Sequence, residues 1–199
     1  MSVTALRYAG LLGVLGCERL LELAVSRRNI AWARARGGRL APDPAWPAMV
    51  ALHAALPVAA LAEVVLAGRR PRLAAPMLAV VAAAQALRWA SVAALGRRWS
   101  VRVVTVPDAP AVTRGPYRWI RHPNYLAVAA EVAAVPLVHG AWLTALVASA
   151  VNAGILARRI AAEERALATD PTYRGALMTR PRFVPRWRRA GRVTRSTAP

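Results

Sequence analysis

The chain has 199 residues, a hydrophobic content of 57% and a formal net charge of +19, a combination that soluble domains rarely show. All 28 basic residues are arginine, and they flank apolar runs instead of forming one basic face, which argues against nucleic-acid binding. The single cysteine, Cys17, excludes an internal disulfide and a cysteine-rich metal site, and no metal is predicted. Apolar runs separated by charged loops indicate an integral membrane protein.

Five apolar segments predict an all-α membrane protein with about five transmembrane helices. The first three have the roughly 20 residues that cross hydrocarbon. The last two are shorter and are separated only by residues 139–141, whose glycine predicts the tight turn of a helical hairpin. The first segment is too long for the apolar core of a signal peptide and lacks a small-residue cleavage site, so we expect it to be retained. In chain order the segments are Val3–Val25, Ala48–Ala67, Leu73–Leu95, Tyr125–Val138 and Trp142–Leu156.

The arginines give this layout a direction. With five crossings, the arginines after the first segment, after the third segment and in the C-terminal region all fall on one face of the membrane. The positive-inside rule makes that face cytoplasmic, with the N-terminus outside and the C-terminus inside. A four-span layout would lose the asymmetry. The composition is typical of a GC-rich bacterium, so we expect the bacterial plasma membrane. The opposite face has only Arg7, Arg69, Arg70 and Arg72.

Three regions follow from this layout. Residues 1–96 hold the first three helices, and residues 97–185 hold the polar motif at 121–125, the helical hairpin and the Glu163-Glu164 pair, which we expect to form a catalytic region whose cytoplasmic C-terminal part binds a cofactor. Residues 186–199 form a basic tail that we expect to be disordered. That tail is either a solvated flank or a contact with anionic lipid through Trp187.

The stretch Arg97–Tyr125 has the most side chains suited to chemistry. It starts with the β-like run Val101–Val106 and continues through two proline-containing turns. We expect one helical turn at Arg118–His122, which Pro123 interrupts. Asn124 then lies where it could cap the fourth helix.

Polar side chains are concentrated at the start of that fourth helix. Tyr117, Arg121, His122, Asn124 and Tyr125 lie within nine residues of one another, at the cytoplasmic edge of the membrane. A helix N-terminus with several hydrogen-bonding groups can hold a polar, zwitterionic cofactor beside lipid.

A second polar cluster follows the fifth segment. Arg159 and Glu163 are four residues apart and share a helical face, which fits either a surface ion pair or a functional pair. Charges also occur inside the predicted spans, where they must be paired or must line a polar cavity. Glu18 and Glu22 share one face, and either Glu63 or Glu131 could pair with Arg88. The charged residues concerned are Glu18, Glu22, Glu63, Arg88 and Glu131.

These motifs resemble the isoprenylcysteine carboxyl methyltransferase family. The resemblance rests on Gly115–Tyr125 (GPYRWIRHPNY), on Glu163–Leu167 (EERAL) with Tyr173, and on Arg180–Pro185 (RPRFVP). It covers roughly Arg97–Pro185, whereas the first three helices match only as generic spans.

The resemblance implies S-adenosylmethionine as cofactor and assigns roles to matching positions. Arg159 matches the arginine that faces the methyl acceptor. Ala109–Val112, with Val112 at its end, falls where backbone contact with the cofactor is expected. The residues that match cofactor contacts are Tyr117, His122, Pro123, Asn124, Tyr125 and Glu163.

The predicted reaction transfers a methyl group to a membrane-embedded lipidic acceptor. The family's type reaction is O-methylation of a prenylcysteine carboxylate, which is already a nucleophile at neutral pH. A lipidic phenol or quinol is an alternative, and because a phenol has a pKa near 10 it needs a base, for which Glu131 or His122 could serve. Phospholipid N-methylation is a third possibility, although Arg159 would repel an amine. A small membrane transporter with buried charges is the non-enzyme alternative.

Overall fold

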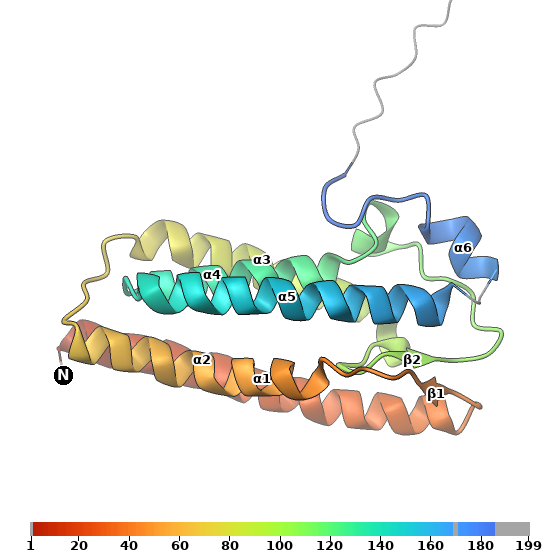
Figure 1. The fold of residues 1–199 in the computed structure, drawn as a ribbon, viewed down its shortest axis with the longest axis horizontal. Coiled ribbons are helices and arrows are strands. Elements are labelled where there is room, and N and C mark those ends of the chain that lie inside the picture. Colours follow the sequence, from red (N-terminus) through yellow and green to blue (C-terminus); the bar gives the residue numbers. More distant parts are fainter. Residues whose placement is uncertain (1, 169–170, 186–199) are drawn as a thin grey trace, which may run out of the picture.

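Long helices dominate the computed structural model, which describes residues 2–168 and 171–185 (Figure 1). Within those ranges, five long helices are joined by short loops, a two-stranded ribbon and two 3-10 helices. The elements are α1 (Val3–Arg34), β1 (Arg39–Leu40), α2 (Trp46–Leu66), α3 (Ala74–Leu95), η1 (Gly96–Arg98), β2 (Val104–Thr105), η2 (Gly115–Arg118), α4 (Pro123–Leu137), α5 (Trp142–Leu167) and α6 (Pro171–Leu177).

The five long helices alternate in direction along one bundle (Figure 1). In this view α1 and α2 form one layer and α3, α4 and α5 form the other, with α3 packed on α4, α4 on α5 and α5 on α2. At the end near the N-terminus, Tyr8, Val64 and Val135 belong to the apolar core between the layers. The Tyr8 hydroxyl donates a hydrogen bond to the Val135 carbonyl at 3.1 Å, which ties α1 to α4.

The predicted hairpin is present as α4 and α5, with its turn at residues 138–141. Gly140 has φ 77°, and a Cβ atom there would lie 2.7 Å from the Arg70 carbonyl oxygen, so the turn requires glycine. The Glu63 carboxylate accepts hydrogen bonds from the Leu143 and Thr144 amides at 3.3 and 2.8 Å and thus caps α5. Glu63 pairs with Arg69, so it is not the partner of Arg88.

Helices α1 and α5 extend well beyond the apolar segments that predicted them. Helix α1 continues to Arg34 and α5 to Leu167. The residues added are mostly alanine, arginine and glutamate, which favour helix as strongly as apolar residues do. Hydropathy therefore marked the apolar part of each helix and missed the part beyond it.

Two local predictions in the connecting stretch were wrong in position. The helical turn expected at Arg118–His122 is instead the 3-10 helix Gly115–Arg118, which begins at the glycine-proline pair. The β-like run reduces to Val104–Thr105, paired antiparallel with Arg39–Leu40. The all-α prediction thus needs a small correction, because the loops after α1 and α3 form a ribbon together.

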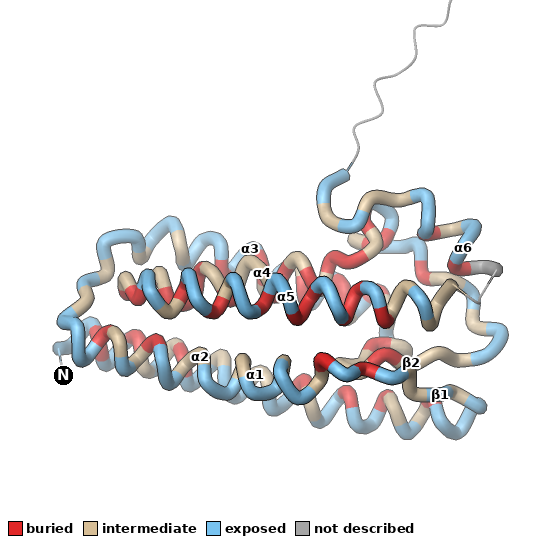
Figure 2. The backbone as a smooth tube through the Cα atoms, viewed as in Figure 1, coloured by how far each residue is buried: buried red, intermediate tan, exposed pale blue. Residues whose placement is uncertain are grey.

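Many residues along the long helices are exposed (Figure 2), and a large share of them are aliphatic. Val14 and Val58 are each more than two-thirds exposed, a pattern suited to lipid contact. Among the described residues, three helices are long and apolar enough to cross a membrane, namely α2, the α3–η1 segment and α5. Helix α1 is longer but has Glu18, Arg19 and Glu22 in its middle.

The arginine-rich segments gather at one end of the bundle. The ribbon, the segment between α3 and α4, and α6 all lie at the end opposite the N-terminus, whereas the loop 67–73 and the turn 138–141 lie at the N-terminal end (Figure 1). This arrangement is the one that the arginine distribution predicted. The predicted tail at 186–199, including Trp187, lies outside the described residues.

Candidate active site

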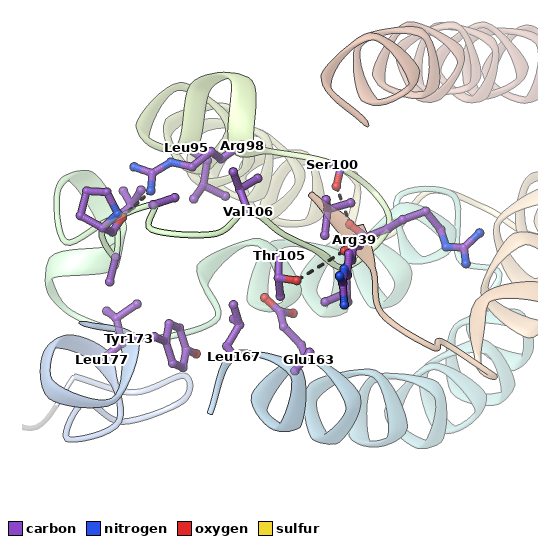
Figure 3. Close-up of a pocket in the computed structure, with 18 of the residues that line it drawn as sticks. Arg39, Leu95, Arg98, Ser100, Thr105, Val106, Glu163, Leu167, Tyr173 and Leu177 are labelled. Carbon is purple, nitrogen blue, oxygen red and sulfur yellow. Dashed lines mark hydrogen bonds between the residues drawn. The ribbon is translucent and has the colours of Figure 1, made fainter. Parts of the chain in front are cut away.

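Two cavities meet at the arginine-rich end of the bundle. The polar-end cavity, of about 650 Å³, lies between the segment 103–112 and the C-terminal part of α5, with α6 at its rim (Figure 3). The interhelical cavity, of about 580 Å³, extends from there between α1 and α2. Both are lined by Leu95, Ser100, Tyr117, Arg121, Tyr125, Arg159 and Glu163. These residues form the shared wall.

The side chain of Arg159 is buried in the shared wall and held from three directions. Its Nη1 lies 3.0 Å from Asp43 Oδ2, and its Nη2 donates to the Val101 carbonyl at 2.7 Å. Its guanidinium carbon lies 5.8 Å from the ring centres of both Trp46 and Tyr125. The Arg159 Nε, by contrast, has no hydrogen-bond partner among the described residues.

Arg159 does not form the surface ion pair with Glu163 that the four-residue spacing allowed. Its ionic partner is Asp43, from the loop before α2, whose side chain is fully buried. Sequence reasoning missed Asp43. The available signal was that Asp43 is a lone acidic residue, between two prolines, in a loop that is otherwise rich in arginine. The positive-inside rule explains the arginines of such a loop but not an acidic residue among them.

Glu163 is therefore left to face the cavities, and three tyrosines surround it. Figure 3 shows Glu163 projecting from α5 toward the cavity, with Tyr173 of α6 on the same side. Glu163 and Arg159 both lie near enough to the Tyr125 hydroxyl to interact with it. Burial and the nearby Glu163 carboxylate both raise the pKa of Tyr117 and of Tyr173 well above their ordinary values. These phenols consequently stay protonated.

Glu164, the next residue, faces away from Glu163 into a separate cationic cluster. Its carboxylate lies 2.9 Å from Arg121 Nη1, 3.1 Å from His122 Nε2 and 2.6 Å from Arg182 Nη2. The Arg121 and His122 amides also donate to the Pro181 and Arg182 carbonyls, at 3.0 and 3.1 Å. The C-terminal motif at 180–183 is thereby fastened against the start of α4.

The remaining motif residues occupy different parts of this region. Pro123 is fully buried at the first position of α4 and lines neither cavity. The expectation that Asn124 caps α4 was wrong, because the cap residue is His122 and makes no side-chain capping bond. Asn124 lies inside the helix instead, where it lines the interhelical cavity. Its buried Oδ1 has no hydrogen-bond partner among the described residues.

Val112 and Tyr117 are brought together beside the polar-end cavity. Both pack against Ala94 of α3, and the Tyr117 hydroxyl interacts with Ser91 one turn earlier. Arg98 donates a hydrogen bond to the Pro110 carbonyl, which holds the segment 109–112 along the cavity. His122, in contrast, lines only the interhelical cavity.

Glu131 belongs to a cluster of charges deeper in the bundle. Its Oε1 accepts a hydrogen bond from Arg88 Nε at 3.1 Å, and a second bond joins Arg88 Nη2 to the other carboxylate oxygen. Arg19 pairs with Glu22 at 2.8 Å. Of these four residues, Arg19, Glu22 and Arg88 line the interhelical cavity and Glu131 does not. Among the described residues, no cluster of histidine, cysteine and acidic side chains could hold a metal ion.

Together the bundle and its paired cavities define a helical membrane protein with a polar site at one end, open both to that end and to the spaces between helices. The model of the isoprenylcysteine carboxyl methyltransferase (ICMT) family matches residues 77–169, from α3 to the end of α5. A protein of Bacillus subtilis (strain 168), the uncharacterized protein YpbQ, is 32% identical over 158 residues, which is 79% of this chain and 94% of that protein.

The chain belongs to the isoprenylcysteine carboxyl methyltransferase family and is an integral membrane methyltransferase. The match begins about twenty residues earlier than the motif-based resemblance, within α3. Helix α3 supplies Ser91 and Leu95 to the site, so its inclusion has a structural reason.

Proposed function

We propose that the protein is an S-adenosylmethionine-dependent methyltransferase that methylates an oxygen of a lipidic acceptor held between its helices. The observation that carries the proposal is the shared wall, through which a polar cavity and an interhelical cavity meet. A soluble cofactor and a membrane-embedded acceptor can then approach one another from two different media. Such positioning is the main contribution that methyl transfer requires of a protein.

The residues around the polar-end cavity fit a zwitterionic cofactor with a sulfonium centre. Bound there, S-adenosylmethionine supplies an electrophilic methyl group. The Glu163 carboxylate and the faces of Tyr117 and Tyr125 suit a cation, since carboxylates and aromatic rings both attract positive charge. The backbone of 109–112 offers amide and carbonyl groups along the same cavity.

We propose that His122 and Asn124 do not contact the cofactor themselves and affect its binding only by positioning neighbouring residues. The His122 ring lies 5.5 Å from the Tyr125 ring, and its Nε2 is engaged by Glu164. These contacts fix the start of α4 and hence the position of Tyr125. Pro123 adds a fixed backbone angle at the same point.

The interhelical cavity fits the hydrocarbon part of an acceptor. Small and apolar side chains of α1 and α2 line it, including Gly13, Gly16, Val50 and Ala54. A lipid lying there would present its polar end to the shared wall. At that wall the guanidinium of Arg159 lies beside the place of the acceptor's polar end, where we propose that it orients the acceptor's oxygen.

For a carboxylate acceptor, Arg159 orients the oxygen and no base is required. The acceptor oxygen forms the new bond to the methyl carbon while the carbon–sulfur bond breaks and its electron pair stays on sulfur. This is the isoprenylcysteine-type reaction, and we propose it as the first candidate.

A lipidic phenol is a second candidate, and the Arg159–Asp43 contact favours it. Asp43 neutralises Arg159, so the shared wall attracts an anion less strongly than a free arginine would. The phenol proton must then go to a base. Glu163 lines both cavities, whereas Glu131 is bound to Arg88 outside the cavity lining, so we propose Glu163 for this role in place of Glu131.

Cofactor binding and methyl transfer test the proposal separately. Calorimetry on the purified protein in detergent should show S-adenosylmethionine binding that Glu163→Ala weakens. Labelled methyl groups should then appear on lipid carboxylates or phenols and not on phospholipid amines. Absence of cofactor binding, with Glu163→Ala and His122→Ala indistinguishable from the unmodified protein, would contradict the proposal and leave the transporter alternative.

A further inference from the structure

The interhelical cavity is not uniformly apolar, and its polar side chains are not those that the reaction uses. Next to the small residues that suit a hydrocarbon chain, the cavity is lined by Arg19, Glu22, His53 and Arg88. Ionisable groups at this depth are costly in a membrane protein unless they are paired or used. The two arginines are paired with carboxylates. Glu22 and His53 each retain an unused hydrogen-bonding atom.

Glu22 is 4% exposed, and its Oε1 accepts no hydrogen bond among the described residues. The nearest cation is Arg88 Nη1 at 3.6 Å, which is longer than a hydrogen bond. The other oxygen, Oε2, is engaged by Arg19 at 2.8 Å. One carboxylate oxygen therefore remains a strong acceptor with no donor to meet it.

His53 presents a second acceptor to the same cavity. Its Nδ1 lies 2.9 Å from the Met49 carbonyl oxygen, and because a carbonyl can only accept, Nδ1 must carry the proton. In the neutral ring Nε2 is then an acceptor, and no described residue donates to it. His53 also lies near enough to Arg88, Arg19 and Glu131 to interact with them electrostatically, which places it beside the charged cluster.

The location of His53 relates this cluster to the reacting end of the cavity. Met49 precedes His53 by four residues on α2, and the Met49 sulfur lies 3.0 Å from Arg159 Nη1. One helical turn, about 5.4 Å, thus separates the Arg159 contact from His53 along α2. If the outermost oxygen of a lipid lies at Arg159, another part of the same headgroup lies beside His53 and Glu22.

We infer that Glu22 and His53 form a subsite for a hydrogen-bond donor on the acceptor's headgroup, distinct from the oxygen that is methylated. This inference rests on the proposed function, because it takes the interhelical cavity as the acceptor's. Two unused acceptors select an O–H or N–H group. An ether, an ester or a hydrocarbon at this place leaves both atoms unpaired.

Two matched pairs of acceptors test the subsite without requiring the acceptor's identity. The phenol pair is 5-pentadecylresorcinol and its monomethyl ether, in which the second oxygen cannot donate. The carboxylate pair is N-acetyl-S-farnesylcysteine, which has an amide N–H, and S-farnesylthiopropionate, which has none. For the pair that is methylated, kcat/KM should favour the donor-bearing member by about tenfold, after correction for the two equivalent hydroxyls of the resorcinol.

Variants at His53 assign that preference to the subsite. His53→Leu should reduce the preference to less than about twofold, mainly by lowering kcat/KM for the donor-bearing member, and His53→Gln, which keeps an acceptor, should restore part of it. Equal kcat/KM for both members, or a preference that His53→Leu leaves intact, would overturn the inference. No methylation of any of the four lipids would instead count against the proposed function, and the inference would fall with it.

Discussion

Two buried arginines line the interhelical cavity, and they are held in different ways. Arg88 and Arg159 are each 3% exposed. Arg88 donates hydrogen bonds to Glu131 through Nε and Nη2, one to each carboxylate oxygen, which is a fork-to-fork contact. Arg159 contacts Asp43 through Nη1 alone and leaves Nε unpaired.

On the proposed function, the difference separates a structural arginine from a functional one. Arg88 is committed to one carboxylate by two hydrogen bonds, whereas Arg159 is fixed by a carboxylate, a carbonyl and two aromatic rings at the wall where both cavities meet. Fixing the side chain beforehand removes the entropy cost of ordering it during the reaction. Burial alone would not have distinguished the two residues.

The largest expected effect on activity is at Arg159. Arg159→Lys keeps a cation beside Asp43 but removes the planar fork, so kcat/KM for the methylated lipid should fall by about 10²-fold while cofactor affinity changes little. The matched variant Arg88→Lys should lower the thermal midpoint and leave kcat/KM within about fivefold. If the two variants gave the same loss of activity at equal stability, the comparison would be wrong.

The largest expected effect on stability is at Glu131. Glu131→Ala leaves Arg88 buried without its main partner, which should lower the free energy of unfolding by about 3–5 kcal/mol, measured by denaturation in detergent. Glu131→Gln keeps an oxygen acceptor and should lose less. Turnover that stays intact over the whole pH range in Glu131→Gln would rule out Glu131 as the base for a phenol, whereas selective loss at low pH would restore that role.

A smaller effect is expected on cofactor binding at Glu163. Glu163→Gln removes the carboxylate but keeps the shape, so the Kd of S-adenosylmethionine should rise by about 10- to 100-fold, as for the loss of a charge-assisted hydrogen bond. Glu164→Gln is the matched control, because Glu164 binds Arg121, His122 and Arg182 instead of lining a cavity. If the Kd rose more in Glu164→Gln than in Glu163→Gln, the cofactor would have to bind on the Glu164 side of α5.

The smallest effect concerns Tyr117. Tyr117→Phe should raise the cofactor Kd by about threefold to tenfold, the cost of one neutral hydrogen bond. Because burial and Glu163 raise the pKa of Tyr117, its hydroxyl stays neutral as the pH rises. Between pH 8 and about pH 10, cofactor affinity should therefore depend on pH in the same way in the unmodified protein and in Tyr117→Phe. A loss with a midpoint near the ordinary tyrosine pKa would contradict this account of its burial.

Some parts of the site were predictable because they are local in sequence. Tyr117 and Tyr125 flank the RHP motif, and both line the two cavities. Glu163 and Arg159 were also identifiable, since helical periodicity places them on one face. Helix α5 does present both to the cavities.

Other parts depended on contacts between distant segments. No spacing rule links Asp43 to Arg159, which is 116 positions later, or the Pro181 carbonyl to the Arg121 amide. The partners of the neighbouring Glu164, namely Arg121, His122 and Arg182, likewise depend on how α5 packs against the start of α4 and the C-terminal motif. Hydropathy could not place the helix ends at Arg34 and Leu167 either, because it reports solvent preference and not backbone conformation.

By itself the sequence determined the helical membrane class, the alternation of helices that puts most arginines at one end, and the motif on which the site is built. Those features follow from hydropathy, charge placement and neighbouring residues, all of which are properties of short segments. The tertiary structure alone decided that two cavities meet at Arg159 and Glu163, and that Arg88 is paired fork-to-fork with Glu131 whereas Arg159 meets Asp43 through one nitrogen. Such features depend on which side chains, far apart in the chain, satisfy one another's charges when water is excluded.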